Sequence, residues 1–364
     1  MTSPTHDKQY YPFLDGFRAL AIFWVILHHV FYFFDMYSLA GNSYWIWKKL
    51  AYLGFLGVDV FFVISGFLIT GLLIEDKNSQ IRVPRFYLRR CFKIIPQYYL
   101  IILAGLVLSW TIPAEIKKNL YYFPEYLVLL QNYSGSVPLL AHTWSIAIEE
   151  HFYLIYPLLI SLIFFIKKEP QQRRKWLTGM LLLLIISGNF LRYYFFKDVH
   201  SPNNPGVWQV THVRFDALIF GCLLKVWENA LSFNKSPHNR LFAILFFALG
   251  FIVFLSFLFQ FNKIGWIDYT LVYLAAGAML VSALKRFHPL IVLTENTFLR
   301  WIGKNSYGIY LWHYPILLAF KNLFMSLGIP LGVVSYVSCS IFLGVLTTQT
   351  VERYFLNLRK SLVP

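Results

Sequence analysis

Charged residues are scarce in this chain. Only 13% of its 364 residues are Asp, Glu, Lys or Arg, and 58% are hydrophobic, whereas a soluble domain has about 25% charged and about 45–50% apolar residues. The mean hydropathy is +0.56. This composition excludes an ordinary soluble domain and predicts an all-α, polytopic integral membrane protein.

Cysteine is also rare, and the short signatures of several common catalytic sites are missing. Cys91, Cys222 and Cys339 have no paired spacing, so neither a disulfide framework nor a zinc site is indicated, and we expect no metal. The sequence contains no Gly-rich P-loop, CxxC, GxSxG or HExxH.

Acidic residues number 17 against 32 basic ones, giving a net charge of +15. In a membrane protein this excess is first a topology signal, and it does not imply nucleic acid.

Ten apolar runs are long enough to cross a bilayer. They lie at about 13–35, 51–74, 94–112, 143–166, 176–196, 208–228, 241–260, 266–284, 306–326 and 330–350. We therefore expect a cytoplasmic segment at 1–12, a transmembrane domain at 13–352 and a cytoplasmic tail at 353–364.

The distribution of basic residues predicts the orientation. Of the 32 Lys and Arg residues, 8 lie in one alternating set of connections and 21 lie in the other set, which is 75–93, 167–175, 225–240, 285–305 and 353–360. By the positive-inside rule the richer set is cytoplasmic, so both termini are predicted to be cytoplasmic.

The first apolar run, LDGFRALAIFWVILHHV, contains four ionisable residues: Asp15, Arg18, His28 and His29. Arg18 and His29 are eleven residues apart, which places them on nearly the same helical face, roughly 16 Å apart along the axis. Ionisable groups inside a membrane usually meet a partner or a substrate. The alternative is a histidine satisfied within the bundle and an arginine that extends to the headgroups.

Two further stretches carry charge. Asp59 lies within the second span, GVDVFFVISGFLIT, and needs either a structural partner or a functional role. Gly57, Ser65 and Gly66 in that span permit close helix packing. The basic run RVPRFYLRRCFKIIP contains Arg89, Arg90 and Lys93, which either form a positive-inside loop or bind a phosphorylated ligand.

The later spans add paired carboxylates and histidines. HTWSIAIEEHFYLIYP holds Glu149 and Glu150, which point in different directions, beside His142 and His151; this pattern favours a functional site over a helix–helix ion pair. In RFDALIFG, the first and third residues, Arg214 and Asp216, are expected to pair with other elements. In SYGIYLWHYP, the i, i+3, i+6 spacing puts the side chains of Tyr307, Tyr310 and His313 on one helical face. This face is either part of a functional site or an aromatic belt at the membrane interface.

Taken together, these stretches resemble the membrane-bound acyltransferase-3 family, whose bacterial members O-acylate cell-surface carbohydrates. Seven motifs occur in order: R-x10-H from Arg18 to His29, GVDVFFVISGFLI, the basic run, WS-x-x-x-E-E-x-FY-x-x-YP, RFDALIFG, SYGIYLWHYP and the VE-R at 351–353. Two positions depart from the family pattern. Lys93 stands where the second arginine of R-x-x-R is usual, and His151 replaces a glutamine and adds a titratable group near the expected site. The SGNH-type domain of some members is expected to be absent.

The resemblance implies an enzyme of the bacterial cytoplasmic membrane. Its donor would be cytoplasmic acyl-CoA, most simply acetyl-CoA, and its acceptor a hydroxyl of a carbohydrate or glycolipid, such as lipopolysaccharide O-antigen or exopolysaccharide. No nucleic-acid partner is expected, and the membrane lipid surrounds the chain. Direct transfer and a covalent acyl-histidine intermediate both remain open.

The resemblance also assigns roles to residues. His29 is expected to be the general base on the acceptor hydroxyl, with Glu149 orienting its imidazole; Arg18 and Asp15 complete the catalytic group. Three basic residues are expected to hold the CoA phosphates: Arg89, Arg90 and Lys93. Five residues are expected to contact the acceptor: Asp59, Trp144, Ser145, Glu150 and His313.

Two other classes of protein fit part of the pattern. Charged groups within ten spans would also suit a proton-coupled transporter or a lipid-linked glycan flippase. A phosphate-binding rim has no obvious use in a simple symporter, and we find no inverted-repeat signature. A scaffold subunit of a polysaccharide export complex is the third option, and it would tolerate loss of His29, whereas the enzyme would not.

Overall fold

The computed structural model describes residues 10–34, 45–74, 83–109, 118–196, 209–232, 238–259 and 265–362. All regular structure in these ranges is helical, which confirms the all-α class. Most of the expected segment 1–12 and the last two residues of the expected tail 353–364 lie outside the described residues.

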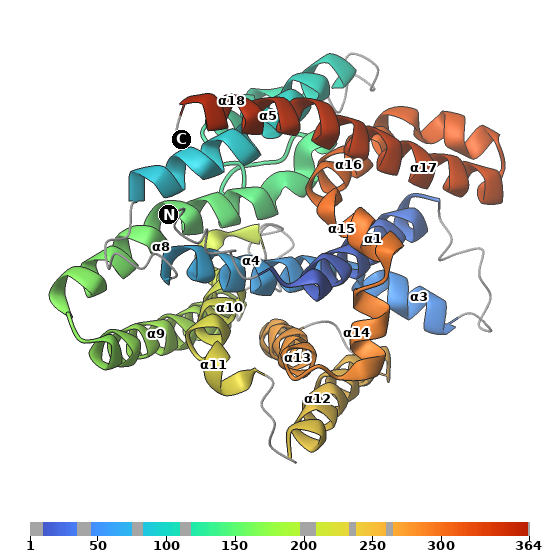
Figure 1. Cartoon of the computed structure of the whole chain (residues 1–364). Helices are drawn as coiled ribbons and strands as arrows, with labels where there is room; N and C mark the ends of the chain where they lie inside the picture. The colour runs from blue at the N-terminus through green and yellow to red at the C-terminus, as the bar shows by residue number, and fades with distance from the viewer. Residues whose placement is uncertain are drawn as a thin grey trace, which may run out of the picture.

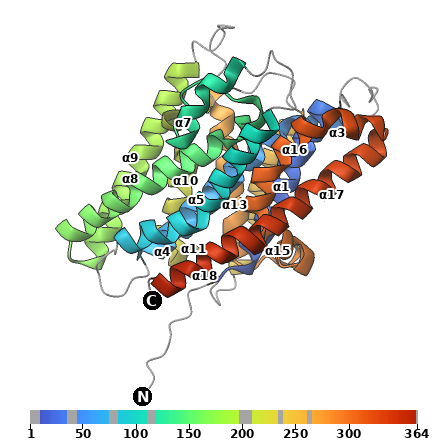
Figure 2. The same cartoon turned by 90° about the horizontal axis from the view of Figure 1, so that it is seen from above.

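The long helices run side by side as one bundle (Figure 2). The first half of the chain forms α1 (Pro12–Phe33), α3 (Trp45–Tyr52), η2 (Leu53–Leu56), α4 (Gly57–Ile74), α5 (Val83–Leu108), η4 (Lys118–Tyr122), α7 (Phe123–Leu127), η5 (Pro138–Thr143), α8 (Trp144–Ile166) and α9 (Pro170–Phe196). The second half forms η7 (Thr211–Val213), α10 (Asp216–Val226), α11 (Glu228–Leu231), α12 (Asn239–Phe259), α13 (Trp266–Leu284), α14 (His288–Thr294), α15 (Thr297–Lys304), α16 (Ser306–Ser326), α17 (Ile329–Thr347), the π-turn η8 (Thr348–Glu352) and α18 (Arg353–Leu362).

Eight helical stretches in the described residues are long and apolar enough to cross a membrane, so the chain is a polytopic membrane protein. The sequence predicted ten spans, and two of these are not among the eight. The predicted span 208–228 contains α10, which has only 11 residues and is about half the length needed to cross a bilayer. The predicted span 306–326 is helical over the same residues as α16, but its polar residues, such as His313 and Lys321, lower its hydropathy.

Helix α4 lies at the centre of the bundle (Figure 1). In its most apolar stretch 72% of the residues are buried inside the protein, against 17% for α12 at the periphery. It packs against α1, α10 and α13, and α1 in turn packs against α14, α15 and α16. The helices that carry most of the predicted motifs therefore meet around α1 and α4.

Two glycines set the close crossing of α4 and α10. A Cβ atom on Gly66 would lie 1.8 Å from the carbonyl oxygen of Leu218, and one on Gly221 would lie 2.0 Å from that of Val63. Both positions therefore require a residue without a side chain. The close packing predicted for Gly66 is confirmed, and it brings the start of α10 beside the charged first turn of α4.

Ion pairs buried in the bundle join α4, α9 and α10. Arg214 donates to both carboxylate oxygens of Asp59 at 2.8 Å, and Arg192 pairs with Asp216. All four side chains are only 1% exposed. The expectation that Arg214 and Asp216 pair with other elements is confirmed.

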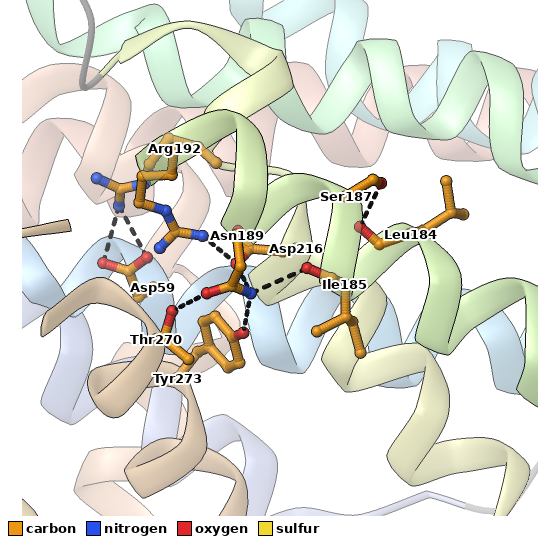
Figure 3. Close-up of polar contacts among 10 residues, drawn as sticks. Asp59, Leu184, Ile185, Ser187, Asn189, Arg192, Asp216, Thr270 and Tyr273 are labelled. Atoms are coloured by element: carbon orange, nitrogen blue, oxygen red, sulfur yellow. Dashed lines mark hydrogen bonds and ion pairs between the residues drawn. The ribbon is translucent and has the colours of Figure 1, made fainter. Parts of the chain in front are cut away.

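The amide of Asn189 extends this network (Figure 3). It donates to Asp216 at 3.2 Å and to the Tyr273 hydroxyl at 3.0 Å, while its oxygen accepts from Thr270 on α13. A charge in the bilayer interior costs several kcal/mol unless it is partnered. The network meets that requirement and ties α9, α10 and α13 together.

Candidate active site

A small cavity of about 100 Å³ opens where α1, α4, α5, α8, α15 and α16 meet. Five of the residues predicted from the sequence line it, namely Arg18, Arg90, Lys93, Ser145 and Glu149. These residues have three different predicted roles and come from three helices, α1, α5 and α8. The fold therefore brings the predicted catalytic and CoA-binding groups together in one place.

Two of the cations in this cavity have no counter-charge in contact. Arg18 and Lys93 are both half-buried, and neither forms a hydrogen bond or ion pair with any residue in the described ranges. An unpaired cation inside a membrane protein is costly and usually marks a ligand site. Four cations line the cavity against the carboxylates of Glu149 and Glu352, so it has the electrostatic character of an anion site.

The carboxylate of Glu149 organises one wall of the cavity. Its Oε1 accepts from Ser65 Oγ at 2.8 Å and its Oε2 accepts from the Tyr153 hydroxyl at 3.0 Å. The guanidinium of Arg90 lies over the ring of Tyr153, 4.8 Å from its centroid, in a cation–π contact. Glu149 thus fixes the ring on which Arg90 rests.

Several lining residues were not predicted as site residues. Tyr153 follows Glu149 by four residues, so helical spacing could have placed it on the same face. Glu352, from the VE-R motif, also lines the cavity and accepts a hydrogen bond from Gln97 at 2.7 Å. Nothing in the sequence indicated that Lys304, on the short helix α15, would reach this point.

Tyr310 separates the cavity from the histidines. Its hydroxyl donates to the carbonyl oxygen of His142 at 2.7 Å, so Ser145 Oγ, at 2.8 Å, is the donor to it. The ring also packs against His142 and His313, with centroids 5.4 and 5.3 Å away. One side chain therefore contacts both the cavity and the cluster behind it.

Three imidazoles form that cluster, which we call the histidine cluster: His29 on α1, His142 on η5 and His313 on α16. The ring centroids of His29 and His313 are 5.0 Å apart, and those of His142 and His313 are 5.2 Å apart. Tyr314 packs against both His29 and His142. Each histidine was singled out from the sequence, but the contact between their rings was not predicted.

Backbone carbonyls fix the neutral tautomers of this cluster. His29 Nδ1 lies 2.9 Å from the Val25 carbonyl oxygen, His313 Nδ1 2.5 Å from that of Tyr310, and His142 Nε2 3.1 Å from that of Leu311. Because a carbonyl only accepts, each of these nitrogens carries the proton. The opposite nitrogen of each ring is therefore bare: it carries a lone pair and no proton.

Two of these bare nitrogens are buried without a donor. Nδ1 of His142 and Nε2 of His313 have no hydrogen-bond partner among the residues that the structure describes, although the side chains are only 5% and 0% exposed. Leaving a buried acceptor unmet costs about 1–3 kcal/mol. Such a cost is common where a group gains its partner only during function.

Glu149 and His29 do not form the hydrogen bond that was expected between them. Glu149 binds Ser65 and Tyr153, and the ring of His29 contacts His313 and Tyr314 instead. Helical spacing predicts which face a residue occupies, but it does not predict which neighbouring helix that face meets.

The remaining predicted residues neither line the cavity nor belong to the histidine cluster. Asp15 accepts from Tyr10, Asp59 is held by Arg214, and Trp144 packs edge-on against Phe62. Arg89 and Glu150 do not line the cavity. The expected titratable group at 151 is also elsewhere, since His151 Nδ1 contacts Thr211 Oγ1 at 2.7 Å.

No group of three His, Cys, Asp or Glu side chains in the described ranges has the arrangement of a metal site. This finding does not test the expectation that the reaction needs no metal, which stays a prediction.

Comparison with known proteins identifies the family. The acyltransferase domain family matches residues 11–351. Peptidoglycan O-acetyltransferase OatA of Listeria monocytogenes is 32% identical over 335 residues, which cover 86% of this chain and 50% of the relative. O-acetyltransferase OatA of Staphylococcus aureus is 29% identical over 348 residues, with 90% and 54% covered. The putative peptidoglycan O-acetyltransferase YrhL of Bacillus subtilis is 30% identical over 343 residues, with 87% and 50% covered. No solved structure matches the chain.

The family match spans nearly the whole chain, so the chain belongs to the membrane-bound acyltransferase-3 family. The resemblance seen in the seven motifs is confirmed. The chain spans about half the length of the curated relatives it matches.

Proposed function

We propose that this protein transfers an acyl group, most simply acetyl, from cytoplasmic acyl-CoA to a hydroxyl of a cell-surface glycan. The observation that carries the proposal is the cavity in which Arg18 and Lys93 form no ion pair with any described residue while Glu149 holds Arg90 in place. CoA is a polyanion, and guanidinium and ammonium groups are the side chains that bind phosphate. The names of the relatives support O-acetyl transfer.

The orientation of the chain supports a cytoplasmic donor. Arg90, Lys93 and Lys304 come from segments that the positive-inside rule assigns to the cytoplasm, and they line the same cavity. We propose that both termini are cytoplasmic and that the protein lies in the cytoplasmic membrane of a bacterium. The cavity, at about 100 Å³, is far smaller than the roughly 300–1,000 Å³ of a typical ligand pocket. Only the acyl end of the donor would enter it, with the phosphates at the basic rim.

His29 is the proposed general base. Nδ1 is committed to the Val25 carbonyl, so the lone pair on Nε2 is free to take the proton of the acceptor hydroxyl. The hydroxyl oxygen then attacks the thioester carbonyl carbon, the carbon–sulfur bond breaks, and the CoA thiolate takes the proton back from Nε2. The products are the O-acyl glycan and free CoA.

His313 takes the place expected for Glu149 in this scheme. Its bare Nε2 has no donor in the resting state and its ring packs against that of His29. The Nδ1 proton of His29 is held by the Val25 carbonyl and the Nε2 proton is the one transferred, so His313 acts on His29 only through this ring contact, which orients the imidazole. Glu149 is then a positioning residue, acting through Tyr153 on Arg90.

Peptidoglycan is the first acceptor to test, because two relatives carry that substrate in their names. Lipopolysaccharide O-antigen and exopolysaccharide are the other acceptors of the same chemistry. All three present secondary and primary sugar hydroxyls to the outer side of the membrane.

The test is transfer of label from acetyl-CoA to purified peptidoglycan glycan strands by the protein in nanodiscs. We expect the wild-type protein to leave alkali-labile label on the glycan. Arg18→Gln should lower the rate of labelling about tenfold or more, because a hydrogen bond to a charged group contributes about 1.5–3 kcal/mol. Arg240→Gln should change that rate little. Arg240 is an exposed arginine at the start of α12 and serves as the matched control. Wild-type protein that neither binds CoA nor labels any of the three glycans would overturn the proposal.

A further inference from the structure

A second and larger cavity, of about 660 Å³, lies at the ends of α8, α9 and α10. It shares no residue with the cavity that holds Glu149. Its walls include Phe164 at the end of α8, Arg173 and Arg174 in the first turns of α9, and Trp227 and Glu228 after α10. The positive-inside rule assigns 167–175 and 225–240 to the cytoplasmic side, and the fold brings these two segments together here.

Two arginines give this cavity a positive charge that no carboxylate neutralises. Arg173 donates from Nε to the carbonyl oxygen of Lys167 at 2.7 Å, and its guanidinium lies 4.7 Å from the ring centroid of Phe164. The guanidinium of Arg174 lies 4.9 Å from the ring centroid of Trp227. Neither forms an ion pair with any residue in the described ranges. Their terminal NH₂ groups are therefore held in place and available.

The acidic residue in the wall is already engaged. Glu228 pairs with Lys225 at 2.6 Å and also accepts a hydrogen bond from Tyr11, and only 6% of its surface is exposed. It therefore does not compensate Arg173 or Arg174. The cavity favours an anion.

The position of the cavity selects an amphiphilic anion. Helix α8 ends at Ile166 and α9 begins at Pro170, so the cavity lies where two candidate spans reach the headgroup region. Apolar side chains on both helices are exposed on the protein surface near these ends, including Phe165, which is 76% exposed, and Leu162, which is 55% exposed. Bound acyl chains would cover this surface, and a free phosphate would leave it uncovered.

We propose that this cavity binds the phosphodiester headgroup of an anionic membrane lipid, with the acyl chains lying along α8 and α9. Guanidinium groups contact phosphate oxygens through paired N–H donors. Basic pockets between membrane helices on the cytoplasmic side are typical sites for such headgroups. The bound lipid would fasten the α8–α9 hairpin to the segment after α10.

The experiment measures lipid retained by the full chain, by native mass spectrometry after exchange into mixtures of phosphatidylglycerol and phosphatidylcholine. We expect wild type to retain phosphatidylglycerol preferentially and the double variant Arg173→Gln/Arg174→Gln to retain about 25-fold less, since each charge near the membrane surface contributes about fivefold. The control is Arg359→Gln/Lys360→Gln, which removes two charges from α18 on the same predicted side. It should retain as much as wild type.

Two further experiments distinguish the contribution of the arginine charge from that of its paired donors, and a bound lipid from a free phosphate. Arg174→Lys keeps the charge and loses the paired donors, so it should retain less than wild type and more than the double variant. Glycerol phosphate at millimolar concentration should not displace the lipid. Equal retention by the double variant and wild type, or full displacement by glycerol phosphate, would overturn the proposal. Donor binding at the other cavity should be unchanged in every variant, so failure here is distinct from failure of the proposed acyl transfer.

Discussion

At the scale of single residues, the buried pair between Asp59 and Arg214 is expected to be structural. Asp59→Asn leaves the guanidinium of Arg214 buried at 1% exposure without its carboxylate, which we expect to destabilise the protein by about 3–5 kcal/mol. Thermal unfolding in detergent measures this. Glu295→Gln, which breaks the exposed pair with Arg286, should cost less than about 1 kcal/mol. Unchanged stability with lost acyl transfer in Asp59→Asn would instead support the acceptor-binding role predicted from the sequence.

Lys93 offers a second test at this scale. Lys93→Gln should raise the KM for acetyl-CoA about tenfold with little change in kcat, because a hydrogen bond to a charged group contributes about 1.5–3 kcal/mol. Lys93→Arg should lower that KM, since it supplies the paired donors of the family pattern. Steady-state kinetics with the exposed Lys360→Gln as control would show this. A fall in kcat at unchanged KM would contradict a donor-binding role.

At the scale of elements, the crossing of α4 and α10 positions both Asp59 and Ser65. Gly221→Ala would place a methyl group 2.0 Å from the carbonyl oxygen of Val63, and overpacking of this kind costs about 1–3 kcal/mol or more. Gly179→Ala on α9 is the matched control, because a Cβ atom there meets nothing within 4 Å; it should be neutral or slightly stabilising. Equal unfolding temperatures for the two variants would show that α4 and α10 leave room for a methyl group at their crossing.

Element boundaries were the part of the fold most accessible from the sequence. Apolar runs end where polar residues begin, so α13 and α16 have the predicted bounds 266–284 and 306–326. The predicted span 94–112 was misplaced, because α5 (Val83–Leu108) begins eleven residues earlier and includes most of the basic run, which the search for apolar residues had left out. The predicted span 208–228 was wrong because hydropathy does not distinguish a span from a short helix. The helix α10 begins only at Asp216, which Arg192 holds inside the bundle.

The site was predictable only in part, for a related reason. Spacing placed Arg18 and His29 on one face of α1 and separated Glu149 from Glu150. It could not show that Lys93 would face Arg18, or that His142 and His313 would surround His29. Those contacts depend on helix packing between residues 75 or more positions apart.

At the scale of the whole molecule, the proposed orientation can be tested with the natural cysteines. Cys91 is exposed on α5 beside Arg90, and Cys222 is buried in α10. A membrane-impermeant maleimide should label Cys91 in inside-out vesicles and leave it unlabelled in intact cells. Cys222 should label only after unfolding. Labelling of Cys91 from outside intact cells would reverse the orientation and remove the cytoplasmic donor site.

The most direct test of the proposed mechanism compares His29→Ala with His28→Ala in the acetyl-transfer assay. His28 is the adjacent residue, and its ring packs edge-on against that of His29 with centroids 5.1 Å apart. Its Nδ1 contacts the Ala51 carbonyl oxygen at 3.0 Å, and within the described residues its ring contacts neither His142 nor His313. We expect a loss of at least about a hundredfold in kcat for His29→Ala, as for removal of a general base. Acetyl-CoA binding should be retained in that variant, and His28→Ala should be close to wild type. Wild-type turnover by His29→Ala, or an equal loss in both variants, would contradict the claim that His29 is the base.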